Sequence, residues 1–396
     1  MTGVADPPTF TIEPPAFVSD PALQAVLAAL PSARLVGGCV RDAIAGREVA
    51  DVDLATPDPP DATVRALAAA GLKSAPTGLA HGTVTAISGG RGFEVTTLRR
   101  DESTDGRHAE VAWTADWQED AARRDFTFNA MSMAPDGRVW DYFGGLADLQ
   151  SGQVRFVGNP AARIREDYLR IPRFFRFHAR YGHGAPDPAA LQAIREGVPG
   201  LARLSPERVW SELKRILSTP DPFGAVQLMA ELGVLAAILP GASPDGLRRL
   251  VAAGAPPDPL LRLEALHPGA ATLAEQFRMS AAERDRLAAL SGPAPGPAMD
   301  DNDLRRLLAS SPPGAIPARA WLTSDGSAPW AALQERLQSL PRPVFRLEGR
   351  DALALGVPPG PAVGALLRQV RDWWLAGGCT ADRAACRAEL ARLVAG

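Results

Sequence analysis

Two aspartates at strand spacing have the clearest potential for chemistry. Asp51 and Asp53 stand in the segment LVGGCVRDAIAGREVADVDLAT, residues 35–56. Because side chains alternate faces along a strand, both carboxylates are expected to point the same way with Cα atoms roughly 6.6 Å apart. Two carboxylates at that spacing can reach a pair of hard cations held about 3.5–4 Å apart. A lone Asp-x-Asp pair is usually a solvated strand charge, so the neighbouring residues must decide.

A glycine pair in the same segment could bind phosphate. Gly37-Gly38 follows the apolar run 33–36 and precedes a brief helix, so its backbone N–H groups lie at a helix N-terminus, where phosphate binds readily. Arg41 adds a positive charge within one turn of those amides. A phosphate cradle and metal-binding carboxylates in one short unit suggest chemistry on a nucleoside triphosphate.

Strands and helices alternate around this segment. The runs of β-branched and apolar residues bounded by turn residues are 83–87, 93–98, 131–134 and 139–142. In the second run, Glu94 could join Asp51 and Asp53. Helices are expected over 22–30 and 61–71. This alternation is typical of an α/β region with a mixed sheet.

The rest of the chain has mainly helical signals. The polar segment 99–116 has no apolar period and predicts a mobile loop, and the Pro-rich segment 310–320 predicts a connection. Ser280 and Glu283 form a capping box, and Thr380 is expected to cap the last helix. The expected fold class is an α+β N-terminal head with a small mixed β-sheet, followed by an all-α neck, body and tail.

Composition limits the functional classes. A chain of 396 residues is expected to form two to four domains. No apolar run approaches the roughly 20 residues needed to span a bilayer, and the N-terminus does not look like a signal peptide. The three cysteines suggest no disulfide framework and suit a reducing cytoplasm. Because the net charge is −3, nucleic-acid binding would have to rest on local patches.

Five motifs in order carry a resemblance to a known family. They are residues 35–56, RRDFTFNA (123–130), DYFGGLADLQSG (141–152), EDYLRIPRFFRF (166–177) and LSPERVWSELKRIL (204–217). In this order they resemble the catalytic, ribose-recognition, hinge, base-recognition and last-neck-helix motifs of the class II tRNA nucleotidyltransferase and bacterial poly(A) polymerase superfamily. A nucleotidyltransferase head with a helical neck, body and tail is therefore implied.

The resemblance divides the chain into five parts. They are an extended N-terminal arm (1–18), the nucleotidyltransferase head (19–150), a neck that recognises the base (151–220), a helical body (221–300) and a tRNA-binding tail (301–396).

The resemblance also assigns roles to single residues. It implies that Asp51 and Asp53 hold two Mg²⁺ ions, with Glu94 as the third catalytic carboxylate. The triphosphate-binding residues would be Gly37, Gly38, Arg41 and Arg173, and the ribose-binding residues Arg124, Asp125 and Asn129. An arginine stripe over 163–180 is the candidate for RNA binding, represented by Arg176 and Arg180.

Asp167 and Arg170 are implied to select the base. Lying one helical turn apart, they are expected on one face, where a carboxylate can accept from an amino group and a guanidinium can donate two hydrogen bonds. Cytosine and adenine share an amino group beside a ring nitrogen, so the pair could act as a template for C and A. Tyr168 stands where the family usually has proline, and Pro172 predicts a kink or a later helix start.

The implied activity is the addition of CCA to tRNA from CTP and ATP. Alternatives are a poly(A) polymerase, an enzyme adding only CC, and a catalytically inactive tRNA-binding protein. The nearly uncharged segment 80–90 argues against the first, the full-length segment 99–116 against the second, and the intact acidic residues Asp51, Asp53 and Glu94 against the third. No membrane or protein partner is implied.

Overall fold

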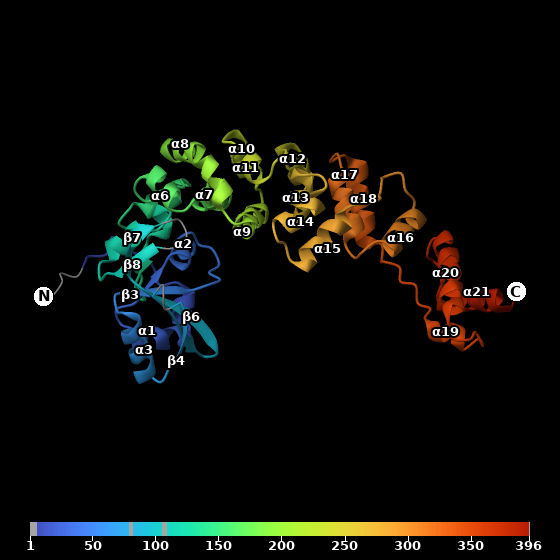
Figure 1. Cartoon of the computed structure of the whole chain (residues 1–396), viewed down its shortest axis with the longest axis horizontal. Coiled ribbons are helices and arrows are strands. Elements are labelled where there is room, and N and C mark those ends of the chain that lie inside the picture. The colour runs from blue at the N-terminus through green and yellow to red at the C-terminus, as the bar shows by residue number, and fades with distance from the viewer. Residues whose placement is uncertain (1–5, 79–81, 105–108, 396) are drawn as a thin grey trace. The chain divides into compact units, whose positions relative to one another are not determined.

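The computed structural model describes residues 6–78, 82–104 and 109–395, so parts of the segments 80–90 and 99–116 lie outside the described residues. The chain forms two compact units: Met1–Ile216 with Leu228–Ile238, and Leu217–Gln227 with Leu239–Gly396. All strands described belong to the first unit (Figure 1). The finer division into arm, head, neck, body and tail stays a prediction.

An eight-stranded sheet organises the first unit, in the order β1-β10-β9-β2-β3-β6-β5-β4. The strands are β1 (Phe10–Thr11), β2 (Arg34–Val36), β3 (Asp53–Thr56), β4 (Lys73–Gly78), β5 (Thr83–Ser88), β6 (Arg91–Thr97), β9 (Ser132–Met133) and β10 (Arg138–Trp140). Among these strands β3 and β6 pair in parallel and the other neighbours are antiparallel. The expected α+β class with a mixed sheet is confirmed.

Short helices pack against the sheet. They are η1 (Ala16–Ser19), α1 (Pro21–Ala29), α2 (Gly38–Ile44), α3 (Pro60–Ala69), α4 (Trp117–Ala122), η3 (Thr127–Asn129) and α5 (Gly145–Ser151). α1 and α3 lie side by side against β5 (Figure 1). Asp20 caps α1 by accepting from the Ala22 N–H at 2.8 Å, as expected. α3 begins at Pro60, so Asp61 lies in its first turn and does not cap it.

The segment predicted to be an N-terminal arm takes part in the sheet. β1 pairs with β10 through Phe10 and Val139, and the Trp140 indole N–H donates to the Asp6 carbonyl at 2.8 Å. The edge strand of the sheet is therefore formed by residues without a recognisable strand pattern.

The predicted loop over 99–116 is wrong for most of its length. β7 (Arg99–Thr104) and β8 (Ala109–Trp113) pair as an antiparallel hairpin. β7 has the sequence RRDEST and is polar throughout, so it lacks the alternation of apolar and polar residues by which a strand is recognised.

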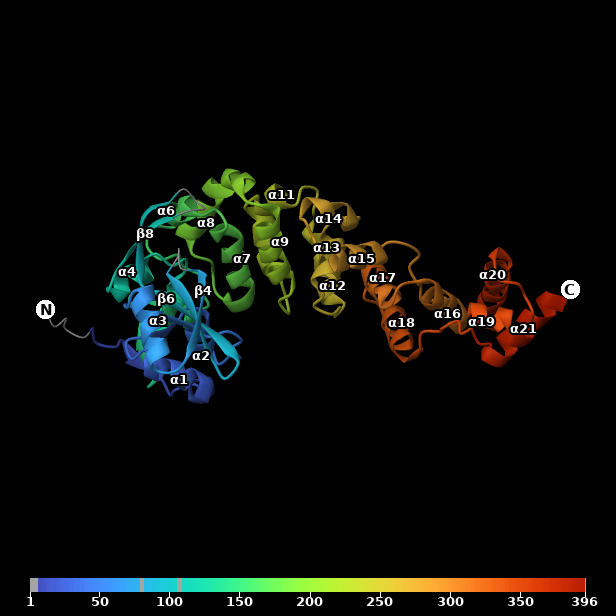
Figure 2. The same cartoon turned by 60° about the horizontal axis from the view of Figure 1, so that its bottom comes forward.

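Helices α6 (Pro160–Glu166), α7 (Arg170–Tyr181), α8 (Pro188–Gly197), η4 (Val198–Arg203) and α9 (Pro206–Leu217) follow. Figure 2 shows α7 and α9 side by side, and Arg176 on α7 pairs with Glu212 on α9 at 3.3 Å. Phe174 and Phe177 of α7 pack against Phe126, with ring centroids 6.4 and 5.2 Å away. This aromatic contact fixes α7 to the segment 123–130.

The second unit is helical. After α10 (Phe223–Glu231) and α11 (Val234–Ile238), which lie near the boundary between the units, its elements are α12 (Pro244–Ala252), α13 (Pro259–Leu266), η5 (Ala270–Thr272), α14 (Leu273–Gln276), α15 (Ala281–Leu290), α16 (Asp301–Ser310), α17 (Ala315–Thr323), α18 (Ala328–Ser339), α19 (Gly349–Leu353), α20 (Pro361–Ala376) and α21 (Arg383–Ala395).

Helix caps in this unit test the sequence predictions. The capping box of Ser280 and Glu283 is confirmed. The connection predicted over 310–320 is wrong, because α17 begins inside it. The predicted cap by Thr380 is also wrong: α21 begins at Arg383, and Asp382 accepts from the Ala385 N–H at 2.8 Å. Thr380 and Asp382 are both of a type that caps helices, and Asp382 does so.

Candidate active site

Asp53 and Glu94 lie opposite each other on the two parallel strands. They are Cα partners in the register of β3 and β6. Asp51 is not in a strand, because β3 begins at Asp53; the predicted Asp51-Val52-Asp53 strand is therefore wrong in its first two residues. Burial raises the pKa of Asp53, Glu94 and Asp51 raise it further, and Arg124 opposes them. The three carboxylates thus share one electrostatic environment.

These carboxylates fit a divalent metal by their chemistry. Carboxylate oxygens are the hard ligands that Mg²⁺ prefers, and a cation would relieve the repulsion that raises the Asp53 pKa. Within the described part of the chain, no three His, Cys, Asp or Glu side chains form a ready metal cage. Mg²⁺ is commonly held by one or two carboxylates together with substrate phosphates, so an incomplete protein shell suits this site.

Gly37 and Gly38 leave room for two guanidinium groups beside the turn before α2. Gly37 has φ 70° and ψ −123°, a conformation that glycine adopts far more readily than other residues. A Cβ added to Gly37 would lie 3.2 Å from Arg124 Nη1, and one added to Gly38 would lie 3.6 Å from Arg41 Nη2. α2 has only 7 residues, so the positive charge of the turn comes mainly from these arginines.

A chain of hydrogen bonds joins the predicted triphosphate and ribose groups. Arg41 Nη1 donates to Asn129 Oδ1 at 2.6 Å, and Asn129 Nδ2 donates to Asp125 Oδ1 at 2.9 Å. Arg173 Nε donates to Asp125 Oδ2 at 2.7 Å. Burial opposes ionisation of Asp125, but Arg173 and Asn129 hold its pKa below the usual range. The head and α7 therefore share a buried, charged network.

Asp42 and Asp120 hold the two arginines of the glycine turn, Arg41 and Arg124, which we call the cradle arginines. No role was predicted for either aspartate from the sequence. Asp42 receives Arg41 Nε and Nη2 at 3.1 and 2.9 Å, and it also accepts from the Tyr181 hydroxyl. Asp120 is 3% exposed and pairs with Arg124 at 3.2 Å. The available signal was their place in the sequence, since Asp42 follows Arg41 directly and Asp120 stands four residues before Arg124.

The two arginines predicted to bind RNA have different surroundings. Arg176 faces Glu212, a buried residue of α9, and burial lowers the Arg176 pKa to about 10 although Glu212 opposes the shift. The Arg180 side chain is 45% exposed and lies 3.8 Å from Asp42. Of the two, Arg180 is accessible to a ligand.

Asp167 and Arg170 do not share a helix face. α6 ends at Glu166 and α7 begins at Arg170, so Asp167 lies in the link between them, in extended conformation. The late helix start predicted from Pro172 is confirmed, because Pro172 is in the first turn, where its missing N–H costs little. The expected single face is wrong.

Each of the two residues has its own partners. Asp167 Oδ2 accepts from Arg208 at 2.8 Å, and its Oδ1 accepts from the Leu169 N–H. Arg170 donates to the carbonyls of Arg163 and Arg123 at 2.8 and 3.2 Å and pairs with Glu166 at 2.5 Å. Arg170 is thus fixed between the head and α6.

Comparison with known proteins decides the family. The chain matches the poly A polymerase head domain over residues 33–155 and the probable RNA and SrmB-binding site of polymerase A over 185–245. It is 37% identical over 366 residues to the mitochondrial CCA tRNA nucleotidyltransferase 1 of Mus musculus, covering 87% of this chain and 83% of that protein. The chain belongs to the tRNA nucleotidyltransferase and poly(A) polymerase family.

Family members are nucleotidyltransferases, and the resemblance read from the motifs is confirmed. The Danio rerio enzyme of the same name is 48% identical over 204 residues, which cover 51% of this chain and 47% of that protein. A crystal structure of the Bacillus stearothermophilus CCA-adding enzyme in complex with CTP has a TM-score of 0.71 and 26% identity, covering 95% of this chain and 98% of that one. The family head spans the carboxylates and the glycine turn.

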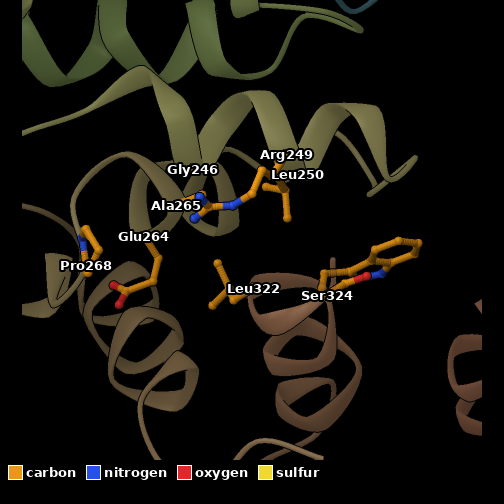
Figure 3. Close-up of a pocket in the computed structure, with 9 residues that line it drawn as sticks. Gly246, Arg249, Leu250, Glu264, Ala265, Pro268, Leu322 and Ser324 are labelled. Carbon is orange, nitrogen blue, oxygen red and sulfur yellow. The ribbon is translucent and has the colours of Figure 1, made fainter. Parts of the chain in front are cut away.

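A cavity in the second unit is separate from this site. It is lined by residues of α12, α13 and α17 and by the segments that follow α13 and α17, and Figure 3 shows Arg249, Glu264 and Leu322 around it. Its volume is about 150 Å³. Pockets for nucleotide-sized ligands measure about 300–1,000 Å³, so this one is too small for a nucleoside triphosphate.

In the described part of the chain, no helix is long and apolar enough for a membrane span.

Proposed function

We propose that the protein adds C, C and A to the 3′ end of tRNA, using CTP and ATP without a nucleic-acid template. Two comparisons support the substrates. Relatives named CCA tRNA nucleotidyltransferase match most of the chain, and the related Bacillus stearothermophilus enzyme is in complex with CTP. We also infer a cytoplasmic location, since none of the three cysteines is in a disulfide and reducing compartments favour free thiols.

The observation that carries the proposal is the pairing of Asp53 with Glu94 close to the Gly37-Gly38 turn. In the proposed site Asp51 and Asp53 hold two Mg²⁺ ions, and Glu94 supports them from β6. Bound Mg²⁺ activates a hydroxyl and neutralises charge on a phosphate under attack. Asp51, Asp53 and Glu94 would thereby bring the RNA 3′-hydroxyl and the α-phosphate of the nucleotide together.

The arginines of the cradle bind and orient the triphosphate in this proposal. Arg41 and Arg124 stand at the glycine turn, where a Cβ added to Gly37 would crowd Arg124 and one added to Gly38 would touch Arg41. Arg173 joins through Asp125, which fixes its guanidinium by two hydrogen bonds. Because the two Asp125 oxygens already accept four hydrogen bonds from Phe126, Asn129 and Arg173, its contribution to ribose recognition is to hold Asn129 and Arg173 in place.

Selection of C and A is proposed for Asp167 and Arg170. The Asp167 carboxylate has lone pairs beyond those used by Arg208 and Leu169, so it can still accept from a base amino group. Arg170 has N–H groups beyond those bonded to Arg123, Arg163 and Glu166. The polar partners of each residue hold it rigid, which favours a fixed template.

Sequencing of reaction products tests the function directly. Purified enzyme is incubated with Mg²⁺ and tRNA lacking CCA, with CTP, ATP, both, or all four nucleotides. Extension by CCA with both nucleotides is the expected result. Long A tracts would assign the protein to poly(A) synthesis, termination after CC would assign it to partial addition, and no extension would support an inactive tRNA-binding protein.

A further inference from the structure

A second cavity of the first unit lies where α2, α5 and α7 end. Its volume is about 430 Å³, and its lining includes Ile44, Arg47, Gln150, Arg180, Tyr181 and His183. This volume is within the range of about 300–1,000 Å³ that is usual for ligand pockets. Arg180, a predicted RNA-binding residue, is the only one of these six with a predicted role, so the cavity has no assigned ligand.

Two arginines flank the aromatic side of the cavity. The guanidinium carbons of Arg47 and Arg180 lie 4.9 and 5.5 Å from the centre of the Tyr181 ring. Arg47 Nη2 also donates to the Arg180 carbonyl at 2.9 Å, which caps the end of α7. Capping uses one of the five N–H groups of Arg47, so a fixed guanidinium remains able to bind a further acceptor.

The charge around the cavity is positive. Among the described residues, no carboxylate pairs with Arg47, and the acidic partner of Arg180 is Asp42 at 3.8 Å. Asp42 is already bonded to Arg41 at 2.9 Å and to the Tyr181 hydroxyl. Asp42 is therefore shared between Arg41 and Arg180, and Arg47 has no carboxylate partner in the described part of the chain, so an anion in the cavity would balance the excess charge.

We propose that this cavity binds a phosphate group through Arg47 and Arg180. Guanidinium groups match phosphate in charge and geometry, and the cavity is open to a ligand larger than a single ion. The phosphate belongs to the backbone of the RNA substrate, an assignment that rests on the proposed function. Free pyrophosphate has the same chemistry and is the other source to be tested.

The test uses the full chain, with Arg47→Ala, Arg47→Lys and the control Arg65→Ala, which changes an exposed arginine of α3. Binding of tRNA lacking CCA is measured by fluorescence anisotropy across a series of KCl concentrations. Loss of one phosphate contact lowers the slope of log Kd against log salt by about 0.7–0.9. Arg47→Ala should show this loss, whereas Arg47→Lys and Arg65→Ala should keep the wild-type slope.

Calorimetric titration with inorganic pyrophosphate, without RNA, separates the two sources. An altered salt slope identifies the RNA backbone, and loss of one pyrophosphate site in Arg47→Ala with an unaltered slope identifies the free anion. Wild-type behaviour of Arg47→Ala in both measurements would overturn the proposal. Neither measurement needs catalysis, so failure of CCA addition in product sequencing would be a separate result.

Discussion

Asp53 carries a charge that the metal-free protein tolerates poorly. Burial raises its pKa above the ordinary value of 3.8, and the carboxylates of Glu94 and Asp51 raise it further. A carboxyl group with a raised pKa destabilises the folded state once it ionises. The metal-free protein therefore loses this part of its stability as the pH rises from below 3.8 through the raised pKa.

The raised pKa of Asp53 predicts opposite effects of Asp53→Asn on thermal stability with and without Mg²⁺. In EDTA at neutral pH the variant should have a higher Tm than wild type, because the unfavourable charge is gone. Mg²⁺ at ten times its Kd stabilises wild type by about 1.4 kcal/mol and raises its Tm by about 3–5 °C. The variant should respond little. Thermal unfolding in EDTA and in Mg²⁺ measures both effects, and equal Mg²⁺ responses would refute Asp53 as a ligand.

The base-selecting pair can be tested without a large loss of stability. Asp167→Asn weakens an ion pair with Arg208 whose side chains are 29% and 42% exposed, which should cost less than about 1 kcal/mol. The ratio of kcat/KM for CTP and ATP against that for UTP and GTP should fall at least tenfold in Asp167→Asn.

Arg208→Ala is the matched control, because it breaks the same ion pair and leaves Asp167 intact. It should keep most of the wild-type selectivity, because the Leu169 N–H still holds the Asp167 carboxylate. Unchanged selectivity in Asp167→Asn would remove the template role. Arg170→Ala is less informative alone, since it also removes hydrogen bonds to the carbonyls of Arg123 and Arg163 and should lower the Tm.

The link between α6 and α7 depends on close packing against η4. A Cβ on Gly200 would overlap the ring of Tyr168, the residue that stands where the family usually has proline. Gly200→Ala should therefore destabilise the protein by about 1–3 kcal/mol through overpacking. Tyr168→Ala should remove most of this penalty in the double variant. Chemical denaturation of the four proteins gives the coupling, and additive effects would contradict the contact.

Elements with a strong local signal could be predicted from the sequence. The hairpin of β5 and β6 follows from β-branched runs around a glycine turn. The alternation of side chains along the second run predicted that Glu94 could join Asp53, and the two residues are partners in the sheet. The break before α7 follows from Pro172, whose ring excludes an interior helix position.

Other features depend on residues distant in sequence. The partner of Asp167 is Arg208, 41 positions later, and no periodic pattern in the sequence predicts this ion pair. β7 is polar along its whole length and has no alternating apolar pattern, so only its pairing with β8 identifies it as a strand. Asp51 falls just before β3 because pairing with β6 begins at Asp53. Tertiary pairing decided these three cases.

At the scale of the molecule, a buried arginine closes the second unit. Arg262 is 2% exposed and donates to the carbonyls of Leu217, Thr219 and Pro220, which join the unit from the end of α9. These contacts tie the segment 217–227 to α13. Because the chain forms two units, its unfolding is not expected to be a single two-state transition.

Arg262→Met should leave those carbonyls unpaired and destabilise the second unit by about 2–4 kcal/mol. Calorimetry should then show a lower melting transition for this unit and an unchanged one for the first. Arg249→Ala, an exposed arginine of α12, is the control and should melt as wild type does. A uniform shift of both transitions would contradict independent units.

We propose that nucleotidyl transfer takes place at Asp53 and Glu94. Single-turnover addition of CMP to tRNA lacking CCA is measured with wild type, Asp53→Asn and the control Glu48→Gln, an exposed residue between α2 and β3. We expect Asp53→Asn to lose at least about 10³-fold in rate, which corresponds to about 4 kcal/mol of transition-state stabilisation, with tRNA affinity within about twofold of wild type, or about 0.4 kcal/mol. Glu48→Gln should retain both. Addition by Asp53→Asn at the wild-type rate in Mg²⁺ would contradict the account.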